Sequence, residues 1–429
     1  MAVIQAGSSG APGSIFPYLK EIYGPAIIST LNDEVPLWSK LKNAKETMDM
    51  ELGGRGLVWP VITKRGGGVG FVAENQSVAT AGSYSYSRAE ATGKEFYGRL
   101  EITKKSMAAS STNKKAFARA LDQEMQNLQN EFRWNLNRAL WGNKVDDETT
   151  GILAVVDGAV TGAKTVNIDN GSTFHMYEGM NIRIATAADH AAFPGAGDSA
   201  VVDSIPDFNT FETVGNVTLV DNDLIAVGDA NFTSYDEEIT GVSFIVSDAD
   251  PLYGLNPLTV PRWKARVDDN GGTNRSISHE LMDSMFDAVK DQSGSVPNCI
   301  FGHSSTTREV KKLMEADVRY VPRKYDGGYD RKGLSWDNGY GTVCELEIDR
   351  FCPLNSLFFL STSALGIGWE TDDKFDWVDD HSPGNPLRHV ADKVNFEAVY
   401  GGIFELISNN RRAHGVIEDI TVNTSTFGL

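Results

Sequence analysis

The chain has 429 residues and a mass of 46.7 kDa, with 41% hydrophobic and 23% charged residues. It is therefore long enough to bury a core and exceeds one ordinary domain of roughly 100 to 200 residues. Its 58 acidic and 39 basic residues give a formal net charge of -19, a negative field that repels nucleic acids and anionic membranes. Three cysteines, Cys299, Cys344 and Cys352, are too few for a disulfide framework and fit a reducing cytosol.

The N-terminal region carries no targeting pattern. Residues 1–14 are mostly Ala, Gly and Ser, and the first lysine is Lys20, so we expect a flexible tail and no cleaved secretion signal. The uncharged segment 354–369 has 16 residues and is too short and too polar to span a bilayer. Between residues 15 and 50, short apolar clusters alternate with Pro and Gly, which predicts an arm that needs another surface on which to pack.

A long hairpin is predicted between residues 51 and 103. An apolar run at 57–62 precedes a glycine-rich tip, and apolar and polar residues then alternate from 96 to 103, the period of a strand with one buried face. Pro60 restricts the first strand to the edge of a sheet. Because a ribbon of two strands is marginally stable alone in water, we infer that something outside its own subunit stabilises it.

Residues 113–141 predict one long amphipathic helix. Its apolar residues recur at spacings of three and four and form a single stripe: Phe117, Leu121, Met125, Leu128, Phe132, Leu136 and Leu140. Gly142 ends the helix, whose length at 1.5 Å per residue is roughly 43 Å. Acidic residues alternate with its basic ones, so the charges favour salt bridges to a neighbouring subunit as much as a contact with nucleic acid.

The charge changes abruptly at residue 151. Residues 151–250 contain 16 Asp or Glu but only Lys164 and Arg183 as basic residues, a balance of -14. Short segments with strand character alternate there with Gly, Asp and Asn turn signals, at 166–168, 182–185, 210–214, 217–220 and 224–227. We interpret this stretch as a small all-β module inserted into another fold.

The remainder mixes helices and strands without a regular repeat. An apolar stripe from Ile277 to Val289 predicts a helix ending near Gly294. Thr306 and Glu309 suggest a capping box for the next helix, with Pro322 as its stop. Residues 343–348, 357–360 and 394–407 are typical of strands. The expected fold class is α+β.

Motifs for catalysis or phosphate binding are incomplete. Gly93 and Lys94 are followed by Glu95 rather than Ser or Thr, which argues against a phosphate loop. Asp283 stands where a zinc motif beginning at His279 requires a second histidine. The histidines are scattered, and the spacing of Cys344 and Cys352 does not match a metal clip.

Acidic clusters are the remaining candidates for a cation site. Two groups, Asp221, Asp223 and Asp229, and Asp376, Asp379 and Asp380, have no calcium-loop spacing, and a solvated charged face is the simpler interpretation. We therefore nominate no catalytic, cofactor-binding or metal-binding residue, and we expect no cofactor.

The order of these parts resembles the major capsid protein of tailed bacteriophages, the Hong Kong 97-type coat fold, over nearly the whole chain. The resemblance rests on an arm, a glycine-tipped hairpin ending in Phe96 to Ile102, a solitary long helix closing with Leu140-Trp141-Gly142-Asn143, and an α+β remainder. The segments 296–303, leading into a helix at 305–316, and 396–414 are further matches. None of these strings is diagnostic alone, and their order is the evidence.

The resemblance implies a division of the chain. It predicts an N-terminal arm at 1–50, an E-loop hairpin at 51–103 and a peripheral domain with its spine helix at 104–150. An inserted acidic β-domain at 151–250, an axial domain at 251–366 and the rest of the peripheral domain at 367–429 follow. The insertion departs from the minimal fold, although this family accepts such additions. Because only about 50 residues precede the hairpin, we expect no long fused scaffolding segment.

The implied function is structural. Copies of the chain are expected to form pentamers and hexamers and then an icosahedral shell around double-stranded DNA, without sequence-specific DNA contacts or a membrane. Its other partners would be a separate scaffolding protein, a portal and a decoration protein, with assembly in the bacterial host cytoplasm and a final place in the virion capsid. Some family members crosslink subunits through lysine, and Lys64 lies near the hairpin tip, but no partner for it is identified.

Two other classes remain open. One is the shell subunit of an encapsulin-like nanocompartment, whose chains are usually shorter and lack such an insertion. The other is a carboxylate-dependent hydrolase with the β-module as an appendage, for which no carboxylate pair is evident.

Overall fold

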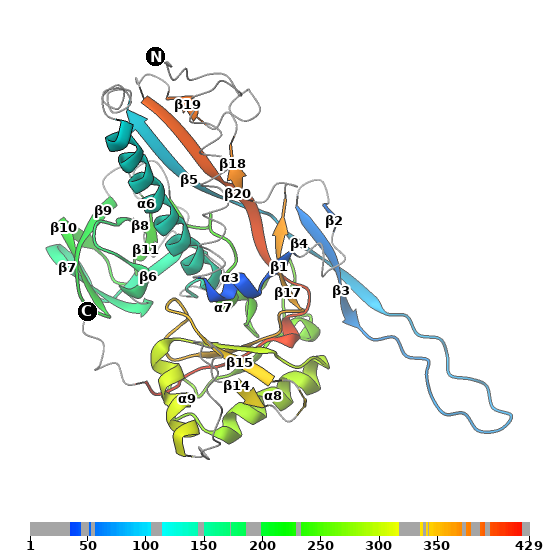
Figure 1. The fold of residues 1–429 in the computed structure, drawn as a ribbon. Coiled ribbons are helices and arrows are strands. Elements are labelled where there is room, and N and C mark those ends of the chain that lie inside the picture. The colour runs from blue at the N-terminus through cyan, green and yellow to red at the C-terminus, as the bar shows by residue number, and fades with distance from the viewer. Residues whose placement is uncertain are drawn as a thin grey trace, which may run out of the picture. The chain divides into compact units, whose positions relative to one another are not determined.

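A computed structural model of the chain (Figure 1) describes fourteen ranges of residues, and the statements below concern these ranges. They are 35–43, 51–52, 56–103, 114–144, 150–171, 173–185, 199–228, 233–316, 335–337, 340–341, 343–370, 375–378, 387–390 and 395–422. Most of the predicted N-terminal arm, Pro322, Asp229, Asp379 and Asp380 lie outside them. None of the helices in these ranges is long and apolar enough to cross a membrane.

The described chain falls into two compact units. The first contains residues 1–40, 93–138 and 369–405, and the second contains residues 41–92, 139–368 and 406–429. The chain passes from one unit to the other inside three elements, namely helix α6 (Lys114–Trp141), strand β17 (Leu365–Trp369) and strand β20 (Asn395–Ser408). Each unit is described by itself.

In the first unit a sheet is covered by the long helix. Strand β5 (Lys94–Thr103) pairs antiparallel with β20 over ten residues, and β18 (Asp376–Trp377) and β19 (Leu387–His389) also pair with β20. The predicted helix is confirmed as α6, in which Leu128, Phe132 and Leu136 are buried. At 1.5 Å per residue its 28 residues span about 42 Å.

Aromatic side chains fill the space between this helix and the sheet. Phe96 of β5 and Phe132 of α6 have ring centroids 4.4 Å apart, and Trp38 of the short helix α3 (Pro36–Lys40) stacks on Phe375 at 5.4 Å. Gly98 lets the helix approach, because a Cβ there would lie 2.7 Å from the side chain of Leu128.

In the second unit, a six-stranded sheet carries the main core. Its order is β12-β21-β16-β13-β15-β14. The bounds are Arg266–Asp268 for β12, Cys299–Gly302 for β13, Ser335–Asp337 for β14, Val343–Ile348 for β15, Leu357–Leu360 for β16 and Gly415–Ile417 for β21. The strands predicted at 343–348 and 357–360 are thus confirmed, as is the strand at 394–407, which is β20.

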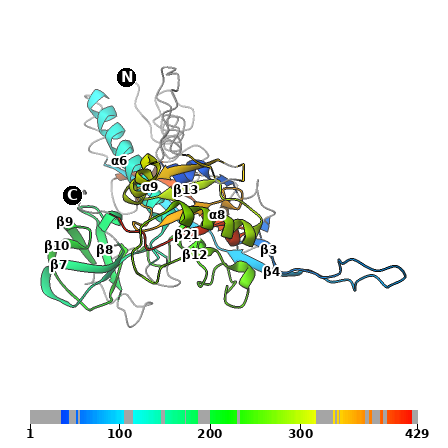
Figure 2. The ribbon, with the colours of Figure 1, turned by 90° about the horizontal axis from the view of Figure 1, so that it is seen from below.

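Two helices pack on one face of this sheet (Figure 2). Helix α8 (His279–Ser293) contributes Met282, Met285, Phe286 and Val289, and α9 (Ser304–Ala316) contributes Val310, to one buried cluster with the sheet residues. Ser278 caps α8 by accepting from the Leu281 N–H, and Gly294 ends it at a φ of 77°. The opposite face holds Trp141, the fully buried end of α6, against the rings of Phe301 and Phe358.

The predicted capping box of α9 is wrong. The helix begins at Ser304, so Thr306 lies inside its first turn, where it is fully buried and its hydroxyl donates to the Leu354 carbonyl. Glu309 pairs with Lys312 instead of reaching back to the helix start. The cap is His303, whose carbonyl accepts from the Thr307 N–H and whose Nδ1 accepts from the Ser305 N–H.

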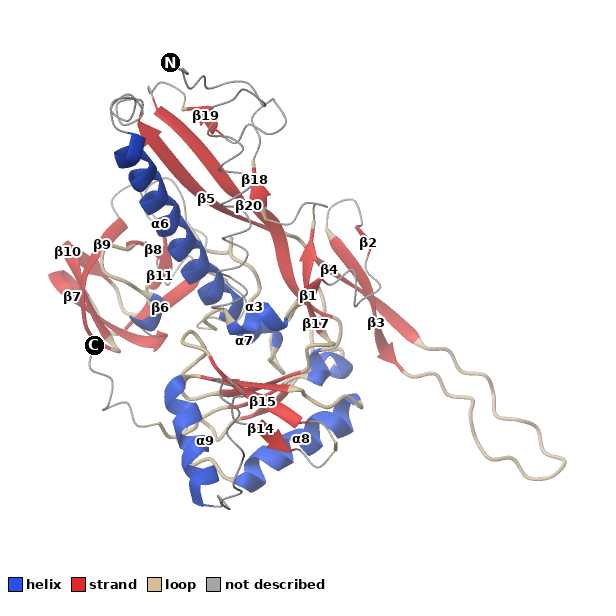
Figure 3. Ribbon diagram, in the orientation of Figure 1, coloured by secondary structure: helices blue, strands red, loops and turns tan. Residues whose placement is uncertain are grey.

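The acidic stretch forms a closed six-stranded barrel (Figure 3). Its order is β10-β7-β6-β11-β8-β9. The strands are Ile152–Val156 for β6, Val160–Gly171 for β7, Asn181–Ala185 for β8, Ser199–Asp207 for β9, Thr210–Leu219 for β10 and Leu224–Val227 for β11. The predicted strands at 166–168, 182–185 and 224–227 are confirmed, whereas those at 210–214 and 217–220 form one bulged strand. A 3-10 turn, η2 (Thr173–His175), joins β7 to β8.

The hairpin exists, but its second strand is not the one predicted. Strand β3 (Leu57–Lys64) pairs antiparallel with β4 (Ser85–Ala91), and the alternating segment 96–103 belongs to β5 of the first unit. Alternation shows that one face of a strand is buried and does not show which strand is its neighbour. The prediction that Pro60 restricts this strand to a sheet edge is wrong, because β3 lies between β2 (Glu51–Leu52) and β4 in a three-stranded sheet. The sheet accepts the proline because β2 meets β3 at Leu57 and Val58, and Pro60 pairs with Arg88 of β4.

Short elements complete the second unit. Strand β1 (Lys42–Asn43) pairs parallel with β17 (Leu365–Trp369) at Gly366 and Ile367. Helix α7 (Val242–Ile245) and the 3-10 turns η3 (Pro261–Trp263) and η4 (Arg411–Ala413) lie in the connections around β12 and β20.

Candidate functional site

The β3 and β4 hairpin continues into a long loop (Figures 1 and 2). Large apolar side chains of this loop are exposed: between residues 65 and 84, Phe71 is 112% and Val78 is 81% exposed relative to the unfolded reference. Isolated exposed hydrophobic residues are ordinary. A run of them on a projecting loop is typical of a surface that meets another molecule.

Glycine allows the two sides of this tip to approach each other. A Cβ on Gly82 would lie 2.3 Å from the backbone nitrogen of Gly67, and the Gly82 N–H donates to the Gly67 carbonyl at 2.8 Å. Gly68 has a φ of 113°, which side chains rarely tolerate. The tip is therefore a narrow backbone ribbon with no core of its own.

The root of the hairpin, in contrast, is packed. Leu57, Trp59 and Val61 alternate on the inner face of β3, with exposures of 0%, 2% and 6%, and Trp59 lies opposite the small Ala89 of β4. They share a buried cluster with Tyr253, Leu255, Trp263 and Ile407. The Tyr253 hydroxyl donates to the Leu406 carbonyl at 2.6 Å, so the root is joined to the body by both apolar and polar contacts.

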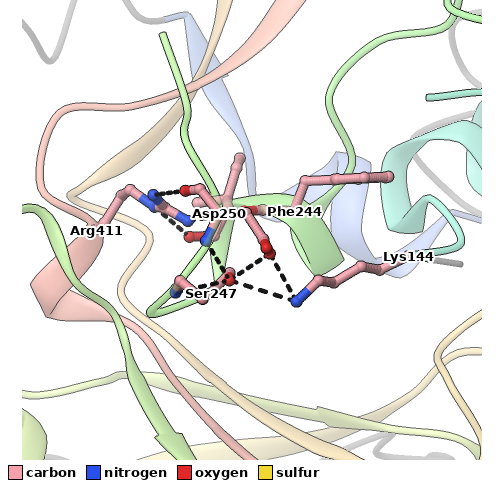
Figure 4. A network of polar contacts seen from close by, with 7 residues as sticks. Lys144, Phe244, Ser247, Asp250 and Arg411 are labelled. Carbon is pink, nitrogen blue, oxygen red and sulfur yellow. Dashed lines mark hydrogen bonds and ion pairs between the residues drawn. The ribbon is translucent and has the colours of Figure 1, made fainter. Parts of the chain in front are cut away.

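A buried arginine holds the segment beside this root (Figure 4). Arg411 is fully buried and donates to the carbonyls of Phe244, Ile245 and Asp250 at 2.8 to 3.0 Å. Two of these carbonyls end helix α7, where carbonyl groups lack partners within the helix. Burial lowers the pKa of Arg411 to about 10, which still leaves the guanidinium charged at neutral pH.

Lys144 approaches Asp250 from the opposite side (Figure 4). Its Nζ lies 2.6 Å from Asp250 Oδ2 and 3.4 Å from the Ser247 hydroxyl, which itself donates to Asp250. Asp250 is 5% exposed, so its charge is desolvated and needs this partner. The network has the character of a structural tie, because every donor in it already has an acceptor.

His414 forms one of two buried Ser-His contacts in the described ranges. Its Nε2 lies 3.1 Å from the Ser408 hydroxyl, while its Nδ1 accepts from the Ser361 backbone N–H. This backbone donor places the ring proton on Nε2, so the imidazole donates to Ser408 and is not placed to take its proton. Burial lowers the pKa of His414 to about 4. The geometry is that of a packed polar core.

The second buried histidine is His303 at the start of α9. Its pKa is lowered to about 4, first by burial and then by the charges of Arg350 and Arg308. The Nδ1 atom lies 2.8 Å from the Ser305 hydroxyl. The residue is 2% exposed, so its neutral ring acts in the helix cap rather than at a surface.

The residues considered for metal motifs in the sequence contact neighbouring side chains and backbone groups. Asp283 accepts from the indole of Trp336 at 3.2 Å, and the His279 ring lies against the same indole. Asp221 accepts from the Gly158 N–H, and Asp223 from the Val220 N–H. Within the described ranges, no three His, Cys, Asp or Glu side chains gather as a metal site would need. The three cysteines are free and buried.

The remaining candidates are not brought together. Lys64 is exposed at the end of β3, near the tip, with no side-chain hydrogen bond or ion pair to any residue in the described ranges. Of the basic residues on α6, Arg138 is 5% exposed, and the side chains of Lys114, Lys115 and Arg119 lie outside the described set. The role of Arg411 was not predicted from the sequence, because its hydrogen-bond acceptors are backbone carbonyls, and every residue type has one.

Comparison with known proteins assigns this architecture to phage coats. The family model of the SU10 major capsid protein matches residues 71–421. The capsid of cyanophage A-1(L) is 13% identical with a TM-score of 0.53, covering 90% of this chain and 93% of that chain. The capsid of a native GTA particle is 9% identical with a TM-score of 0.42, covering 85% and 84%. A structure of Mycobacterium phage Bobi is 9% identical with a TM-score of 0.40, covering 88% and 91%.

No curated protein matches the chain. The likeness to the cyanophage capsid confirms the predicted Hong Kong 97-type α+β fold. The family match extends over most of the sequence, and this family is structural. The chain therefore belongs to the SU10 major capsid protein family and is the major capsid protein of a tailed phage.

Proposed function

We propose that copies of this capsid protein join into pentamers and hexamers that close into an icosahedral head around double-stranded DNA. Contacts repeated head to tail around a symmetry axis close into rings. The packaged DNA is held without sequence-specific contacts, which is consistent with the formal net charge of -19. The chain serves as a structural subunit of the shell and not as an enzyme.

One observation supports this proposal above the others, namely the contrast between the hairpin's packed root and its exposed tip. Ordering a residue costs about 1 to 2 kcal/mol of backbone entropy. The tip buries none of its large apolar side chains between residues 69 and 78, so its own subunit offers little to offset that cost. A neighbouring subunit supplies the missing surface, in interfaces expected to exceed about 2,000 Å².

Electron microscopy of the purified recombinant protein, alone and with its scaffolding protein, tests the proposal. We expect shells with local fivefold and sixfold rings. A monomer that stays monodisperse under all assembly conditions would contradict it. The encapsulin alternative is not favoured by the family match, and it would predict particles that co-purify with a cargo protein and without DNA.

We further propose the division stated from the sequence: arm 1–50, E-loop 51–103, peripheral domain 104–150 and 367–429, inserted β-domain 151–250 and axial domain 251–366. The last strand of the 51–103 segment, β5, pairs with β20 in the first unit and not with the hairpin. The two chain segments that lead into and out of the barrel lie against each other. A Cβ on Gly241 would lie 2.5 Å from the Gly142 nitrogen, and the Thr150 hydroxyl donates to the Glu238 carbonyl at 2.9 Å. An insertion with adjacent ends is one that a fold can accept or lose.

A deletion tests the insertion. Replacing residues 145–239 by a short Gly-Ser linker is expected to leave a soluble, cooperatively folding subunit, because the six-stranded sheet and its helices keep their own core. Circular dichroism and thermal unfolding measure this. Failure to fold would show that the barrel is part of the minimal fold.

The remaining partners are also proposals. A separate scaffolding protein, a portal and a decoration protein would meet the shell, which assembles in the host cytoplasm and ends as the virion capsid. Co-expression with each neighbouring candidate, followed by particle purification, tests them one at a time. Particles of uniform size that form only with a scaffolding protein would support its role.

A further inference from the structure

A cavity of about 430 Å³ opens beside the root of the hairpin. Its walls come from three elements that are distant in sequence, namely β3, η3 and the residues around η4. Trp59, Pro60, Ile62 and Trp263 supply an apolar wall, and Asn410 adds a polar one. The volume is sufficient for two or three side chains of another molecule.

The charged residues that line this cavity are all cations. Arg262 and Arg412 line it, and no carboxylate does. Burial, followed by the charges of Arg262 and Arg65, lowers the pKa of Arg412, so two further guanidinium groups lie near enough to repel the charge of Arg412. None of the three forms an ion pair with a residue in the described ranges, and Nε of Arg412 has no hydrogen-bond acceptor there, whereas each of the three guanidinium nitrogens of Arg411 donates to a carbonyl.

Two donors at this site lack acceptors. The indole nitrogen of Trp59 and Nε of Arg412 are buried with no hydrogen-bond partner, and Trp59 is only 2% exposed. A buried donor without an acceptor is costly. These two atoms have no accessible surface, so the observation that points to an anion brought by another molecule is the positive charge of Arg262 and Arg412 in a cavity that no carboxylate lines.

The hairpin tip carries the complementary groups. Glu74 is the only charged residue between Arg65 and Arg88, and it lies three positions after the fully exposed Phe71. A carboxylate accepts hydrogen bonds from guanidinium groups, and an aromatic ring fits an apolar wall that contains two indoles. The chain's own tip cannot fold back to its root while β3 and β4 stay paired, since the eight residues of β3 span about 26 Å.

We propose that this cavity receives the hairpin tip of a second copy of the chain, with Glu74 against Arg262 and Arg412 and Phe71 against the tryptophan wall. The inference rests on the proposed ring assembly and names the contact that closes it. Because tip and cavity are different surfaces, the contact is head to tail and repeats around a ring.

Charge exchange between the two sides tests the contact. Glu74→Arg and Arg412→Glu are each made alone and together in the full chain, and shell formation is measured by light scattering and electron microscopy. We expect each single variant to lower the yield of shells at least tenfold. The double variant should recover at least tenfold over the weaker single variant, because the opposite charges face each other again.

Matched controls separate this contact from general charge effects. Gln76→Arg places the same arginine at an exposed position two residues from Glu74 while leaving Glu74 in place, and Arg266→Glu reverses an exposed arginine on β12 outside the cavity. Both should assemble like the unmodified chain. Circular dichroism and thermal unfolding of the dissociated subunits establish that each variant is folded.

The outcomes distinguish this inference from the proposed function. If the unmodified chain forms no shells, ring assembly itself fails. If it forms shells and both single variants do so equally well, or the double variant shows no recovery, the tip does not occupy the cavity. Single variants that assemble normally but retain less DNA would also overturn the inference, since a phosphate would then be the anion.

Discussion

The root and the tip of the hairpin belong to one ribbon, but the root is packed against its own subunit and the tip is exposed. At the root, Trp59 is buried against Tyr253 with ring centroids 5.0 Å apart, and the backbone of Glu90 donates to the Tyr253 carbonyl. At the tip, Phe71 touches nothing that buries it. Changes at the root should therefore be detected as lost subunit stability, whereas changes at the tip should be detected as lost assembly.

The largest expected effect is at the root. Trp59→Ala removes a buried indole and leaves a cavity that the paired strands cannot close, so the free energy of unfolding should fall by about 3 to 5 kcal/mol. Chemical denaturation of the dissociated subunit measures it. Phe71→Ala should change the same quantity by less than about 0.5 kcal/mol while reducing shell yield. Equal losses from both variants would erase the contrast.

A second test uses two adjacent arginines. Arg411→Met leaves three buried carbonyls without their charged donor, and we expect a loss of at least about 3 kcal/mol in the free energy of unfolding. Arg412→Met is the control, since its Nε has no acceptor, and stability should stay within about 0.5 kcal/mol. A large loss from the control would show that Arg412 supports the subunit itself.

Acid is expected to lower the stability of the subunit through its two buried histidines, His303 and His414. The pKa values of His303 and His414 are lowered to about 4 in the folded chain, below the ordinary value near 6.5. As pH falls from 6.5 to 4, the unfolded chain binds protons that the folded chain refuses, so stability decreases. We expect about 2 kcal/mol per histidine at pH 5.

Unfolding curves from pH 7 to 4 measure this slope. His303→Asn is the matched variant, because asparagine still caps a helix but does not titrate. The slope should fall to about half. An unchanged slope would assign the acid sensitivity to other groups.

The smallest stability effect is expected at a glycine of the tip. Gly82→Ala forces a Cβ against the Gly67 backbone at 2.3 Å and spreads the ribbon, yet the subunit should lose less than about 0.5 kcal/mol, since the tip contributes no core. Gly241→Ala creates a similar clash with Gly142 inside the body and should cost several times more. Thermal unfolding of both variants compares the two places directly.

Sequence periodicity was a good guide to the elements whose burial repeats along the chain. The stripe of α6 and the strands β15, β16 and β20 follow from spacing alone, and Gly142 ends the helix at a φ of 63°. Pairing was harder. Strand β4 has the sequence SYSRAEA, whose buried residues are Ala89 and Ala91, so its fit against Trp59 and Leu57 depends on small side chains that carry little apolar signal.

The buried polar contacts of Arg411 and the cavity could not be predicted from the sequence, for a different reason. Arg411 binds backbone carbonyls, and a sequence shows residue types but not the carbonyls a fold brings near them. The cavity joins residues 59–62, 262–263 and 409–412, which come together only through the folded chain. The capping box at Thr306 failed because the motif is short and also matches a position inside a helix.

The closed barrel protects closely packed subunits from aggregating through their strands. A strand at the rim of an open sheet offers unpaired N–H and C=O groups to any similar strand nearby. A shell gathers many copies of each module at very high local concentration, where such rims would join into fibres. In the barrel β10 pairs with both β7 and β9, which closes the sheet. Because no edge strand is left unpaired, neighbouring copies of the barrel in a shell cannot join through their strands.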